Sequence, residues 1–398
     1  MRVLFISDVY FPRVNGVSTS IRTFRGELAA CGVETWLVAP QYAGAADADP
    51  EESGVLRVRA ARVPFDPEDR RMAWRALNRT LDALPAGGFD LVHIQTPFIA
   101  HYAGVRYARR AGIPAVATYH TFFEEYLHHY LPVLPRAMGR VLARSFTRSQ
   151  CAALQALIAP SEPMREVLAA YGVSTPVHVV PTGLPADCFR GGDGRAFRER
   201  AGIAAGTPLV TYIGRVAHEK NIGFLVEVFR EVLQSVPAAL LVIAGEGPAR
   251  SALHAQVAAL GLESHVRFAG YLERAGALLD CYAAADAFVF ASRTETQGLV
   301  LLEAMAQGAP VVSTAELGTR SILVPDSGAL VVPEERAAFA AAVVRVLSDA
   351  GLREAMAARG RAYARSWSAT AMAQRLAQVY APLARAPRLG VRGRLTTH

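Results

Sequence analysis

The sequence predicts an α/β protein built from two doubly wound domains. Its 398 residues are too many for one core of ordinary size, so two domains of roughly 150–200 residues are expected. Short apolar runs alternate with helical patterns in the first half of the chain, and the alternation starts again near Leu209. Buried apolar strands that alternate with helices are typical of a parallel sheet covered on both faces.

In the first domain, each expected strand is a short apolar run bounded by polar residues. A loop that carries Pro12 and Gly16 follows the first run, and Gly32 ends the helix expected over residues 18–31. The strands are expected at Arg2–Ser7, Thr35–Ala39, Asp90–Ile94 and Pro114–Thr118.

The second domain repeats the design. Its strands are expected at Leu209–Ile213, Leu240–Ala244, Val266–Ala269, Ala287–Phe290 and Pro310–Ser313. The glycine-rich segment 190–194 predicts a linker, and the domains are expected to span residues 1–188 and 189–367. A cleft between two such domains is a natural place for a ligand.

Composition excludes several classes of protein. With 52% apolar and 19% charged residues the chain is not disordered, and it has neither an apolar run long enough to span a membrane nor a signal-peptide pattern, so a cytosolic protein is expected. The net charge of +7 permits anionic ligands, but no basic and aromatic stripe indicates nucleic acid. The four cysteines form no short CxxC pair, which favours reduced thiols over a zinc or redox motif.

Two cations follow the first strand of the second domain. Residues 214–221 read Gly-Arg-Val-Ala-His-Glu-Lys-Asn, and Gly214 allows a sharp turn at the strand end. Ligands of doubly wound sheets bind at the carboxyl ends of strands. The fork-shaped guanidinium of Arg215 and the ammonium of Lys220 together suit a diphosphate, whereas a solvated loop with two incidental cations is the alternative.

A glycine-bearing turn, Gly245-Glu-Gly247-Pro, follows the next strand. Two glycines at a strand end allow a ligand to approach the backbone closely. An ordinary strand-to-helix turn explains the same residues and is favoured when they are taken alone.

The most informative segment, residues 294–305, follows the last apolar strand before a helix pattern. It reads Thr-Glu-Thr-Gln-Gly-Leu-Val-Leu-Leu-Glu-Ala-Met, so Gly298 opens a helix whose first amides suit a phosphate. Glu295 stands before the helix, where it can accept hydrogen bonds from sugar hydroxyls. Glu303 lies about one turn inside, where it can take both hydroxyls of a ribose. The alternative is a helix-start acid with one buried helical glutamate, but a buried acid needs a partner.

Together these motifs resemble glycosyltransferase family 4, and the resemblance extends from the first residue to about Tyr380. It implies the GT-B fold, with two Rossmann-like domains facing a central cleft and the nucleotide-sugar donor held mainly by the C-terminal domain. It also implies a retaining, metal-independent transfer. A helix at about 368–384 would pack back on the N-terminal domain, ahead of a basic tail at 385–398.

The resemblance assigns a role to each motif residue. Arg215 and Lys220 would hold the donor diphosphate and balance the charge on the leaving nucleoside diphosphate. Glu295 would contact the donor sugar, and Glu303 would bind the ribose. The other donor-binding positions in these motifs are Gly214, Gly245, Gly247, Gly298, Leu299 and Val300.

Three more contacts follow from the resemblance. Backbone near Tyr271 and Leu272 would read the base, and Gly16 would face the donor from the N-terminal domain. Asn15 stands where many relatives carry the first of two glycines. His120, directly after an expected strand, would face the sugar across the cleft, although taken alone it suits a core or capping histidine better.

For the reaction, the resemblance implies front-face attack by the acceptor hydroxyl while the diphosphate leaves. No carboxylate stands out as a double-displacement nucleophile. Asp47-Ala-Asp49 has metal-site spacing but sits in an alanine-rich loop, so neither a metal nor another cofactor is expected.

Two features bear on the acceptor. The spelling around residues 119–130 and 294–298 resembles bacterial diacylglycerol glucosyltransferases, and mannosyltransferases of related spelling exist. A basic stripe every four residues suits an anionic membrane surface, with an ordinary amphipathic helix as the alternative. The stripe comprises Arg136, Arg140, Arg144 and Arg148, with Met138, Val141, Leu142 and Phe146 nearby. The tail arginines Arg385, Arg388, Arg392 and Arg394 would add attraction.

The expected protein is therefore a retaining glycosyltransferase at the inner face of the cell membrane that moves a hexose from UDP-glucose to a lipid such as diacylglycerol. The main alternative is a GDP-mannose-dependent mannosyltransferase that acts on a lipid or polysaccharide precursor. Alternatives of other classes are an inactive regulatory protein that binds sugar nucleotides and a GT-B-fold epimerase. The completeness of the motif set disfavours the inactive protein.

Overall fold

The computed structural model describes the chain in two compact units. Unit 1 comprises Met1–Gly183 with Ala369–His398, and unit 2 comprises Leu184–Ser368. The described residues are 1–42, 53–63, 66–85, 87–120, 136–274 and 276–385, of which 63, 66–69 and 136–140 are described by their backbone alone.

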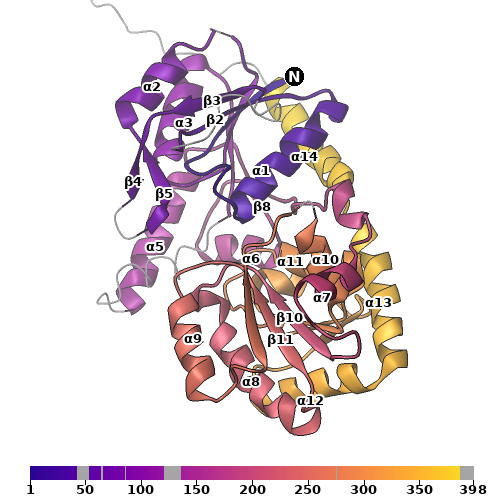
Figure 1. Cartoon of the computed structure of the whole chain (residues 1–398). Coiled ribbons are helices and arrows are strands. Elements are labelled where there is room, and N and C mark those ends of the chain that lie inside the picture. Colours follow the sequence, from indigo (N-terminus) through magenta and orange to yellow (C-terminus); the bar gives the residue numbers. More distant parts are fainter. Residues whose placement is uncertain (43–52, 64–65, 86, 121–135, 275, 386–398) are drawn as a thin grey trace, which may run out of the picture. The chain divides into compact units, whose positions relative to one another are not determined.

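Unit 1 is built on a parallel sheet with the strand order β3-β2-β1-β6-β7-β8-β9 (Figure 1). Its strands are β1 (Arg2–Ile6), β2 (Glu34–Pro40), β3 (Val55–Val58), β6 (Leu91–Ile94), β7 (Ala115–Thr118), β8 (Ala156–Ala159) and β9 (Val177–Val179). A separate antiparallel pair is formed by β4 (Ala60–Val63) and β5 (Asp66–Met72). The sequence predicted β1, β2, β6 and β7 but not β3, β8 and β9. The edge strands β3 and β9 are only partly buried, and β8 lies in an alanine-rich stretch that also suits a helix.

The helices of unit 1 connect these strands. They are α1 (Gly16–Leu28), α2 (Trp74–Asp82), α3 (Ile99–Ala111), α5 (Arg136–Cys151), α6 (Glu162–Ala170) and α14 (Ala369–Arg385). Helix α14 packs against α1, and Leu376 and Tyr380 are fully buried in the core that includes β1. Apolar contacts therefore attach the last described helix to the first domain.

Unit 2 has a second parallel sheet with the order β12-β11-β10-β13-β14-β15. Its strands are β10 (Leu209–Ile213), β11 (Leu240–Ala244), β12 (Val266–Gly270), β13 (Ala287–Phe290), β14 (Val311–Ser313) and β15 (Ala329–Val331). Its helices are α7 (Gly194–Arg200), α8 (Ile222–Ser235), α9 (Arg250–Ala259), α10 (Ala277–Ala284), α11 (Leu299–Gln307), α12 (Arg336–Ser348) and α13 (Ala350–Arg365). Helix α8 packs with α12, and α10 packs with α7 and α11. Two such sheets give the predicted GT-B fold.

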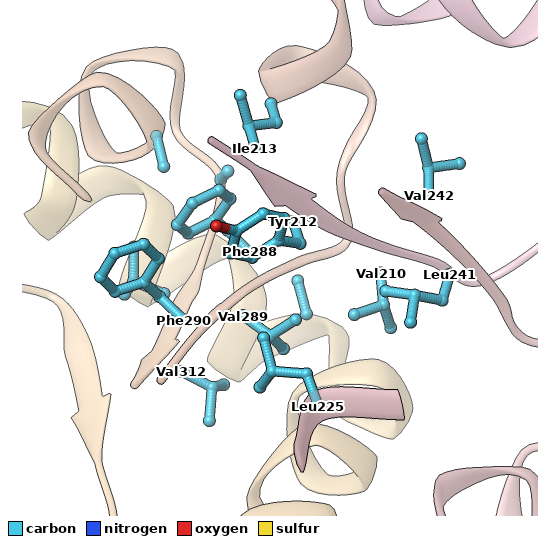
Figure 2. Close-up of a cluster of buried hydrophobic side chains, with 14 of the residues drawn as sticks. Val210, Tyr212, Ile213, Leu225, Leu241, Val242, Phe288, Val289, Phe290 and Val312 are labelled. Atoms are coloured by element: carbon cyan, nitrogen blue, oxygen red, sulfur yellow. The ribbon is translucent and has the colours of Figure 1, made fainter. Parts of the chain in front are cut away.

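The core of unit 2 lies around the central strands β10 and β13 (Figure 2). The rings of Tyr212 and Phe290 stack with their centroids 6.1 Å apart, and those of Phe288 and Phe290 lie 6.3 Å apart. Tyr212 is fully buried, and its hydroxyl donates a hydrogen bond of 3.1 Å to the carbonyl oxygen of Arg215. The core thereby fixes the loop that leaves β10.

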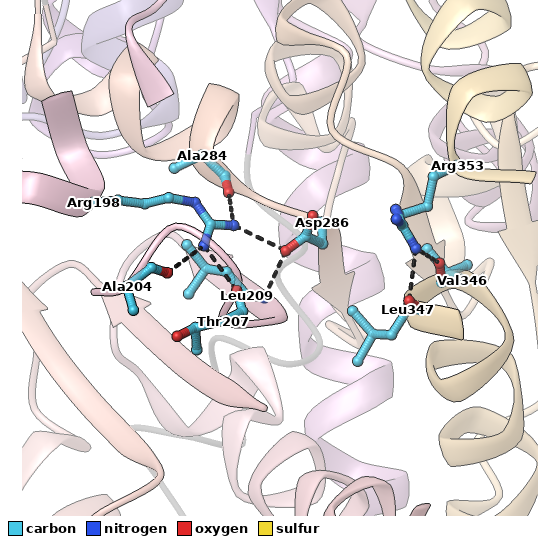
Figure 3. A network of polar contacts seen from close by, with 9 residues as sticks. All are labelled: Arg198, Ala204, Thr207, Leu209, Ala284, Asp286, Val346, Leu347 and Arg353. Atoms are coloured by element: carbon cyan, nitrogen blue, oxygen red, sulfur yellow. Dashed lines mark hydrogen bonds and ion pairs between the residues drawn. The ribbon is translucent and has the colours of Figure 1, made fainter. Parts of the chain in front are cut away.

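A buried guanidinium secures the start of the same two strands (Figure 3). Arg198 on α7 donates to Asp286 Oδ2 at 2.9 Å and to the carbonyl oxygens of Ala284 and Thr207 at 2.8 and 2.7 Å. The same carboxylate oxygen accepts from the amide of Leu209 at 2.8 Å. This network lies at the amino ends of β10 and β13, away from the loops that carry the motifs.

The chain passes between the units at Gly183 and again at Ser368. The amide of Leu184 donates to the carbonyl oxygen of Trp367 at 2.7 Å, which places residues after 183 with unit 2. The glycine-rich segment 190–194 is not the linker that the sequence predicted. A Cβ added to Gly192 would lie 2.3 Å from the carbonyl oxygen of Leu279, so this glycine allows close packing on α10.

No helix within the described residues is long and apolar enough to cross a membrane.

Candidate functional site

The motifs of unit 2 converge at the point where the order of its strands reverses. Strand β10 lies between β11 and β13, and the loops that leave the carboxyl ends of β10 and β13 are neighbours. The ammonium of Lys220 from the first loop forms an ion pair with Glu295 Oε1 from the second, and their side chains are 18% and 20% exposed. Two residues that the sequence selected separately therefore meet at the crevice where doubly wound folds bind ligands.

Lys220 is the only lysine among the 42 lysine and arginine residues of the chain. An ammonium is a compact point charge, whereas a guanidinium is a planar fork, so the two are not interchangeable at a crowded site. Lys220 therefore presents a compact ammonium, rather than a planar guanidinium, to Glu295.

Arg215 is held by its backbone as well as by its charge. Its carbonyl oxygen accepts the hydrogen bond from Tyr212, and its Nη1 lies 3.6 Å from Glu219 Oε1. Burial raises the pKa of Tyr212 well above its usual value, so the phenol remains a hydrogen-bond donor. Each of the two motif cations thus faces one carboxylate, and the four side chains together carry no net charge.

Gly245 and Gly247 of the second turn are required by the packing of the backbone around them. A Cβ on Gly245 would lie 1.9 Å from the carbonyl oxygen of Gly214, and one on Gly247 would lie 2.3 Å from that of Val216. Both have positive φ angles, of 134° and 156°. The amide of Val216 donates to the carbonyl oxygen of Glu246 at 2.9 Å. The backbone of the preceding loop thus lies directly against both glycines.

Helix α11 begins as the sequence predicted. Gly298 precedes its first residue with a φ of 95°, in the left-handed region that favours glycine. The amides of Leu299 and Val300 lie in the first turn, where a helix offers its N–H groups no intrahelical acceptor. The start of α11 therefore presents N–H groups beside Glu295 at the same crevice.

Glu303 lies inside α11 and has the partner that burial demands. Its side chain is 4% exposed and forms an ion pair with Arg274 through Oε1. Its Oε2 accepts a hydrogen bond of 3.0 Å from the hydroxyl of Tyr282 on α10. The carboxylate of Glu303 raises the pKa of Arg274, and burial followed by Glu303 raises that of Tyr282. Sequence reasoning predicted that a partner was needed but identified neither residue.

A second polar network connects the loop after β10 to the loop after β13. Asn221, with a left-handed φ of 56°, donates to Glu334 Oε1 at 3.1 Å and to the carbonyl oxygen of Ala291 at 3.3 Å. Arg293 donates to both oxygens of Glu334, from Nε to Oε2 at 2.7 Å and from Nη2 to Oε1, and these hydrogen bonds are the main cause of the lowered pKa of that carboxyl. Sequence reasoning missed this network because Glu334 follows β15, far along the chain.

The loop after β12 lies next to the glycine turn. The carbonyl oxygen of Gly270 accepts from the amide of Gly245 at 2.7 Å. Tyr271 follows with a side chain 59% exposed, and Leu272 packs partly against the core of unit 2. The segment expected to contact the base is thus held by a backbone hydrogen bond at Gly270, whereas the side chain of Tyr271 is exposed to solvent.

In unit 1, the selected residues lie at the ends of β1 and β7. Asn15 is the N-cap of α1, and its side chain accepts from the amide of Ser18 at 2.9 Å, which explains an asparagine at that position. A Cβ added to Gly16 would have nothing within 4 Å. His120 Nε2 lies 3.2 Å from Gln95 Oε1, and burial lowers the pKa of His120 to about 4. His120 is therefore a neutral imidazole.

The basic stripe is only partly described. Residues 136–151 form helix α5 as expected, and Arg144 and Arg148 are exposed. Val141 and Leu142 are 66% and 50% exposed, whereas Ala143 is fully buried. The side chains of Met138, Arg136 and Arg140 lie outside the described residues, as do residues 121–130, the pair Asp47 and Asp49, and the tail after Arg385.

Within the described ranges, no group of three or more histidine, cysteine, aspartate or glutamate side chains could hold a metal ion. All four cysteines are free thiols.

Comparison with known proteins defines the class. Residues 14–187 match the model of Glycosyltransferase Family 4, and residues 193–363 match that of Glycosyl transferases group 1. The chain resembles the alpha-monoglucosyldiacylglycerol synthase of Streptococcus pneumoniae, with 33% identity over 79% of this chain and 71% of the relative. It is also 30% identical to a GDP-mannose-dependent alpha-mannosyltransferase of Mycobacterium tuberculosis over 92% of this chain and 93% of the relative.

A solved structure agrees on the fold. The sucrose-phosphate synthase of Thermosynechococcus elongatus superposes with a TM-score of 0.79 at 22% identity, over 96% of this chain and 98% of that chain. The protein is a glycosyltransferase with the GT-B fold. It belongs to glycosyltransferase family 4, as the motifs of unit 2 predicted.

Proposed function

We propose that this glycosyltransferase transfers glucose from UDP-glucose to a membrane lipid such as diacylglycerol, with retention of anomeric configuration and without a metal ion. The observation that carries the proposal is the ion pair between Lys220 and Glu295, which joins the loop after β10, where Arg215 also lies, to the loop that leads from β13 into α11. The likeness to a monoglucosyldiacylglycerol synthase supports the acceptor.

The arrangement suits a nucleoside diphosphate as leaving group. Lys220 reaches the crevice already paired with Glu295, so a bound diphosphate would share the ammonium with that carboxylate. Because each cation faces an acid, the first amides of α11 supply the remaining attraction for the two phosphates. As the bond to the sugar breaks, negative charge grows on the diphosphate, and preorganised donors stabilise it.

The acceptor hydroxyl attacks from the face that the diphosphate leaves, and a phosphate oxygen takes its proton. Glu295 is held by an ammonium, so in this scheme it orients the sugar hydroxyls rather than acting as a nucleophile. His120 is neutral because of its lowered pKa, and it offers a hydrogen bond to the sugar rather than a charge. Transfer then rests on positioning and on stabilisation of the leaving group.

The membrane contact is assigned to α5 of unit 1. Arg144 and Arg148 offer cations, and the exposed Val141 and Leu142 offer apolar surface on the same helix. Exposed apolar and basic side chains on one helix favour an anionic bilayer surface, here the inner face of the cell membrane.

A second candidate is transfer of mannose from GDP-mannose to a lipid or polysaccharide precursor. It is favoured by the M. tuberculosis mannosyltransferase, which matches 92% of this chain. The two candidates share the diphosphate, ribose and sugar contacts in unit 2 and differ in the base and in one sugar hydroxyl.

The deciding experiment is a transfer screen with purified protein, UDP- and GDP-sugars, and vesicles with and without diacylglycerol, in the presence of EDTA. Glucosylation of diacylglycerol by UDP-glucose is the expected result, and it also establishes metal independence. Mannosyl transfer from GDP-mannose instead would establish the second candidate. Activity that EDTA abolishes would contradict the metal-independent mechanism.

A further inference from the structure

The carboxylate of Glu303 is engaged on both oxygens by residues to which no role has been assigned. Arg274 lies in the loop after β12, three residues beyond Tyr271, and pairs with Oε1. Tyr282 is fully buried on α10 and donates to Oε2 at 3.0 Å. Elements that are separate in sequence thus fix one side chain of α11.

A carboxylate has about four acceptor positions, two on each oxygen. Arg274 takes one on Oε1 and Tyr282 takes one on Oε2, which leaves one on each oxygen. Two remaining acceptors on one rigid group match a pair of adjacent hydroxyls, each of which donates one hydrogen bond. The vicinal 2′- and 3′-hydroxyls of a ribose have this pattern.

Glu303 could not serve this purpose without its partners. At 4% side-chain exposure, a carboxylate with no counter-ion is strongly disfavoured in its charged form. Only the charged form keeps every lone pair available to hydroxyl donors. Removing either partner would also release the χ angles of Glu303, because the ion pair and the hydrogen bond approach it from different elements.

The geometry points to Arg274 and Tyr282 as positioning residues that hold the carboxylate of Glu303 in the orientation that accepts the ribose hydroxyls of the donor. This inference rests on the proposed donor site. Arg274 is 33% exposed and follows the segment assigned to the base, so one short loop would contact the base and orient the ribose acceptor. The guanidinium of Arg274 would then link recognition of the base to recognition of the ribose.

If the same contacts were purely structural, they would serve only to hold the loop after β12 and helix α10 against α11. The thiol of Cys188 is also buried near this pair, and burial followed by the charge of Glu303 raises its pKa to about 12. The two readings differ in one measurable respect. A purely structural contact affects every nucleotide equally, whereas a positioning residue affects each nucleotide according to the number of ribose hydroxyls that it carries.

The test compares binding of UDP and 2′-deoxy-UDP to the full chain by titration calorimetry. GDP and 2′-deoxy-GDP are measured in parallel, so the result does not depend on which base the enzyme uses. The wild-type protein is expected to prefer the ribonucleotide by about tenfold, as for a charged acceptor that loses its donor. Arg274→Ala is expected to lose most of that preference, because it weakens binding of the ribonucleotide, which carries both hydroxyls, more than binding of the 2′-deoxynucleotide, which keeps only the 3′-hydroxyl.

Two further variants and one control variant keep the test decisive. Tyr282→Phe removes one hydrogen bond at constant ring volume, and it is expected to reduce the preference by about threefold even if Arg274→Ala folds poorly. Arg274→Lys retains the charge and should restore part of the preference. Arg336→Ala removes a guanidinium from a solvent-exposed ion pair with Glu227 on the same unit and should match the wild type.

The outcomes separate this inference from the proposed function. An unchanged preference in both Arg274→Ala and Tyr282→Phe, with Glu303→Ala abolishing it, would overturn the positioning role and leave the donor site standing. An unchanged preference in Glu303→Ala would overturn the ribose assignment itself, and the positioning role with it.

Discussion

The two units differ in how their ionisable groups are partnered. In unit 1, the histidines whose pKa is lowered by burial are His93 in β6, His101 on α3 and His120 after β7, and the buried carboxylate of Asp8 after β1 accepts hydrogen bonds from the hydroxyl of Thr96 and the amide of Ala100. Burial, followed by the nearby His120, lowers the pKa of His93 to about 3, and burial, followed by Arg109, lowers that of His101 to about 4. His93 hydrogen-bonds the hydroxyls of Tyr380 and Thr118, both neutral partners.

In unit 2, the corresponding groups are opposite charges held against each other. Lys220 pairs with Glu295, and Arg274 pairs with Glu303, at the ends of strands around one crevice. Partly desolvated, paired charges are suited to bind and stabilise a charged ligand, whereas neutral hydrogen-bonding groups are suited to hydroxyls. The paired charges of unit 2 are therefore consistent with the diphosphate contact proposed for that unit.

The largest expected effect tests the charged half of this comparison. Arg215→Ala combined with Lys220→Ala should lower turnover at least about a hundredfold, because roughly 3 kcal/mol of leaving-group stabilisation is lost. Steady-state rates with saturating donor measure it. Wild-type turnover in the double variant would remove both cations from the site.

A charge-conserving change sharpens the same prediction. The Lys220→Arg variant should turn over more slowly than the wild type, because a planar guanidinium does not fit the place of a compact ammonium beside Glu295. The matched control is Arg195→Lys, at an exposed position that pairs with Glu199 one helical turn away. Full activity in Lys220→Arg would show that charge alone matters there.

Much of the fold and of the site could be predicted from the sequence, since buried parallel strands are continuous apolar runs and motif loops follow them directly. Lys220, Glu295 and Gly298 lie where their spacing predicted. Arg274 and Tyr282 could not be found in this way. Nothing local distinguishes an arginine that pairs across 29 positions from any solvated arginine.

The glycine turn shows a second limit. The pattern Gly-x-Gly-Pro suited either a close approach by a ligand or an ordinary turn, and the structure shows that the carbonyl oxygens of Gly214 and Val216 lie against these glycines. A glycine in a sequence can indicate that there is no space for a Cβ atom, but it does not indicate which group occupies that space.

The next effect contrasts the glycines of the two units. Gly245→Ala should destabilise unit 2 by about 2–4 kcal/mol, because its Cβ would meet a backbone oxygen at 1.9 Å and its φ is 134°. Gly16→Ala should leave the free energy of unfolding unchanged, since nothing lies within 4 Å. Denaturant titration that resolves the unfolding transition of each domain measures the free energy of unfolding of both variants. If Gly16→Ala keeps its stability but loses donor use, Gly16 serves the ligand rather than the fold.

The pH dependence of stability should also differ between the units. The pKa values of His93 and His101 are lowered from 6.5 to about 3 and 4, so the stability they confer is complete above pH 6.5 and is lost as the pH falls toward those values. The loss is about 1.4 kcal/mol per pH unit for each histidine. The lowered pKa of Glu334 in unit 2 acts only below its ordinary value of 4.5.

Between pH 6.5 and 5, unit 1 should therefore lose stability while unit 2 holds. Hydrogen exchange, corrected for the pH dependence of intrinsic rates, compares the opening free energies of β1 and β6 with those of β10 and β13. Equal losses in the two sheets would contradict the neutral-imidazole account of unit 1.

The smallest effect concerns the membrane. Changing Arg144 and Arg148 to glutamate should lower affinity for anionic vesicles by about tenfold or more, because each basic residue near such a surface contributes about 1 kcal/mol. Cosedimentation with vesicles measures it, and Arg359→Glu with Arg365→Glu on α13 of unit 2 provides an equal change of charge as the control. Equal losses in the two pairs would reduce the effect to net charge and remove α5 from the interface.

The central claim, that unit 2 holds the donor diphosphate through Lys220, has a direct test because Lys220 is the only lysine in the chain. An amine-reactive acylating reagent can modify this side chain in unit 2 and the amino group of Met1 in unit 1, and mass spectrometry separates the two. Saturating UDP or GDP should protect Lys220 and leave Met1 labelled at its original rate. Unchanged labelling of Lys220 at saturating nucleotide would contradict the claim.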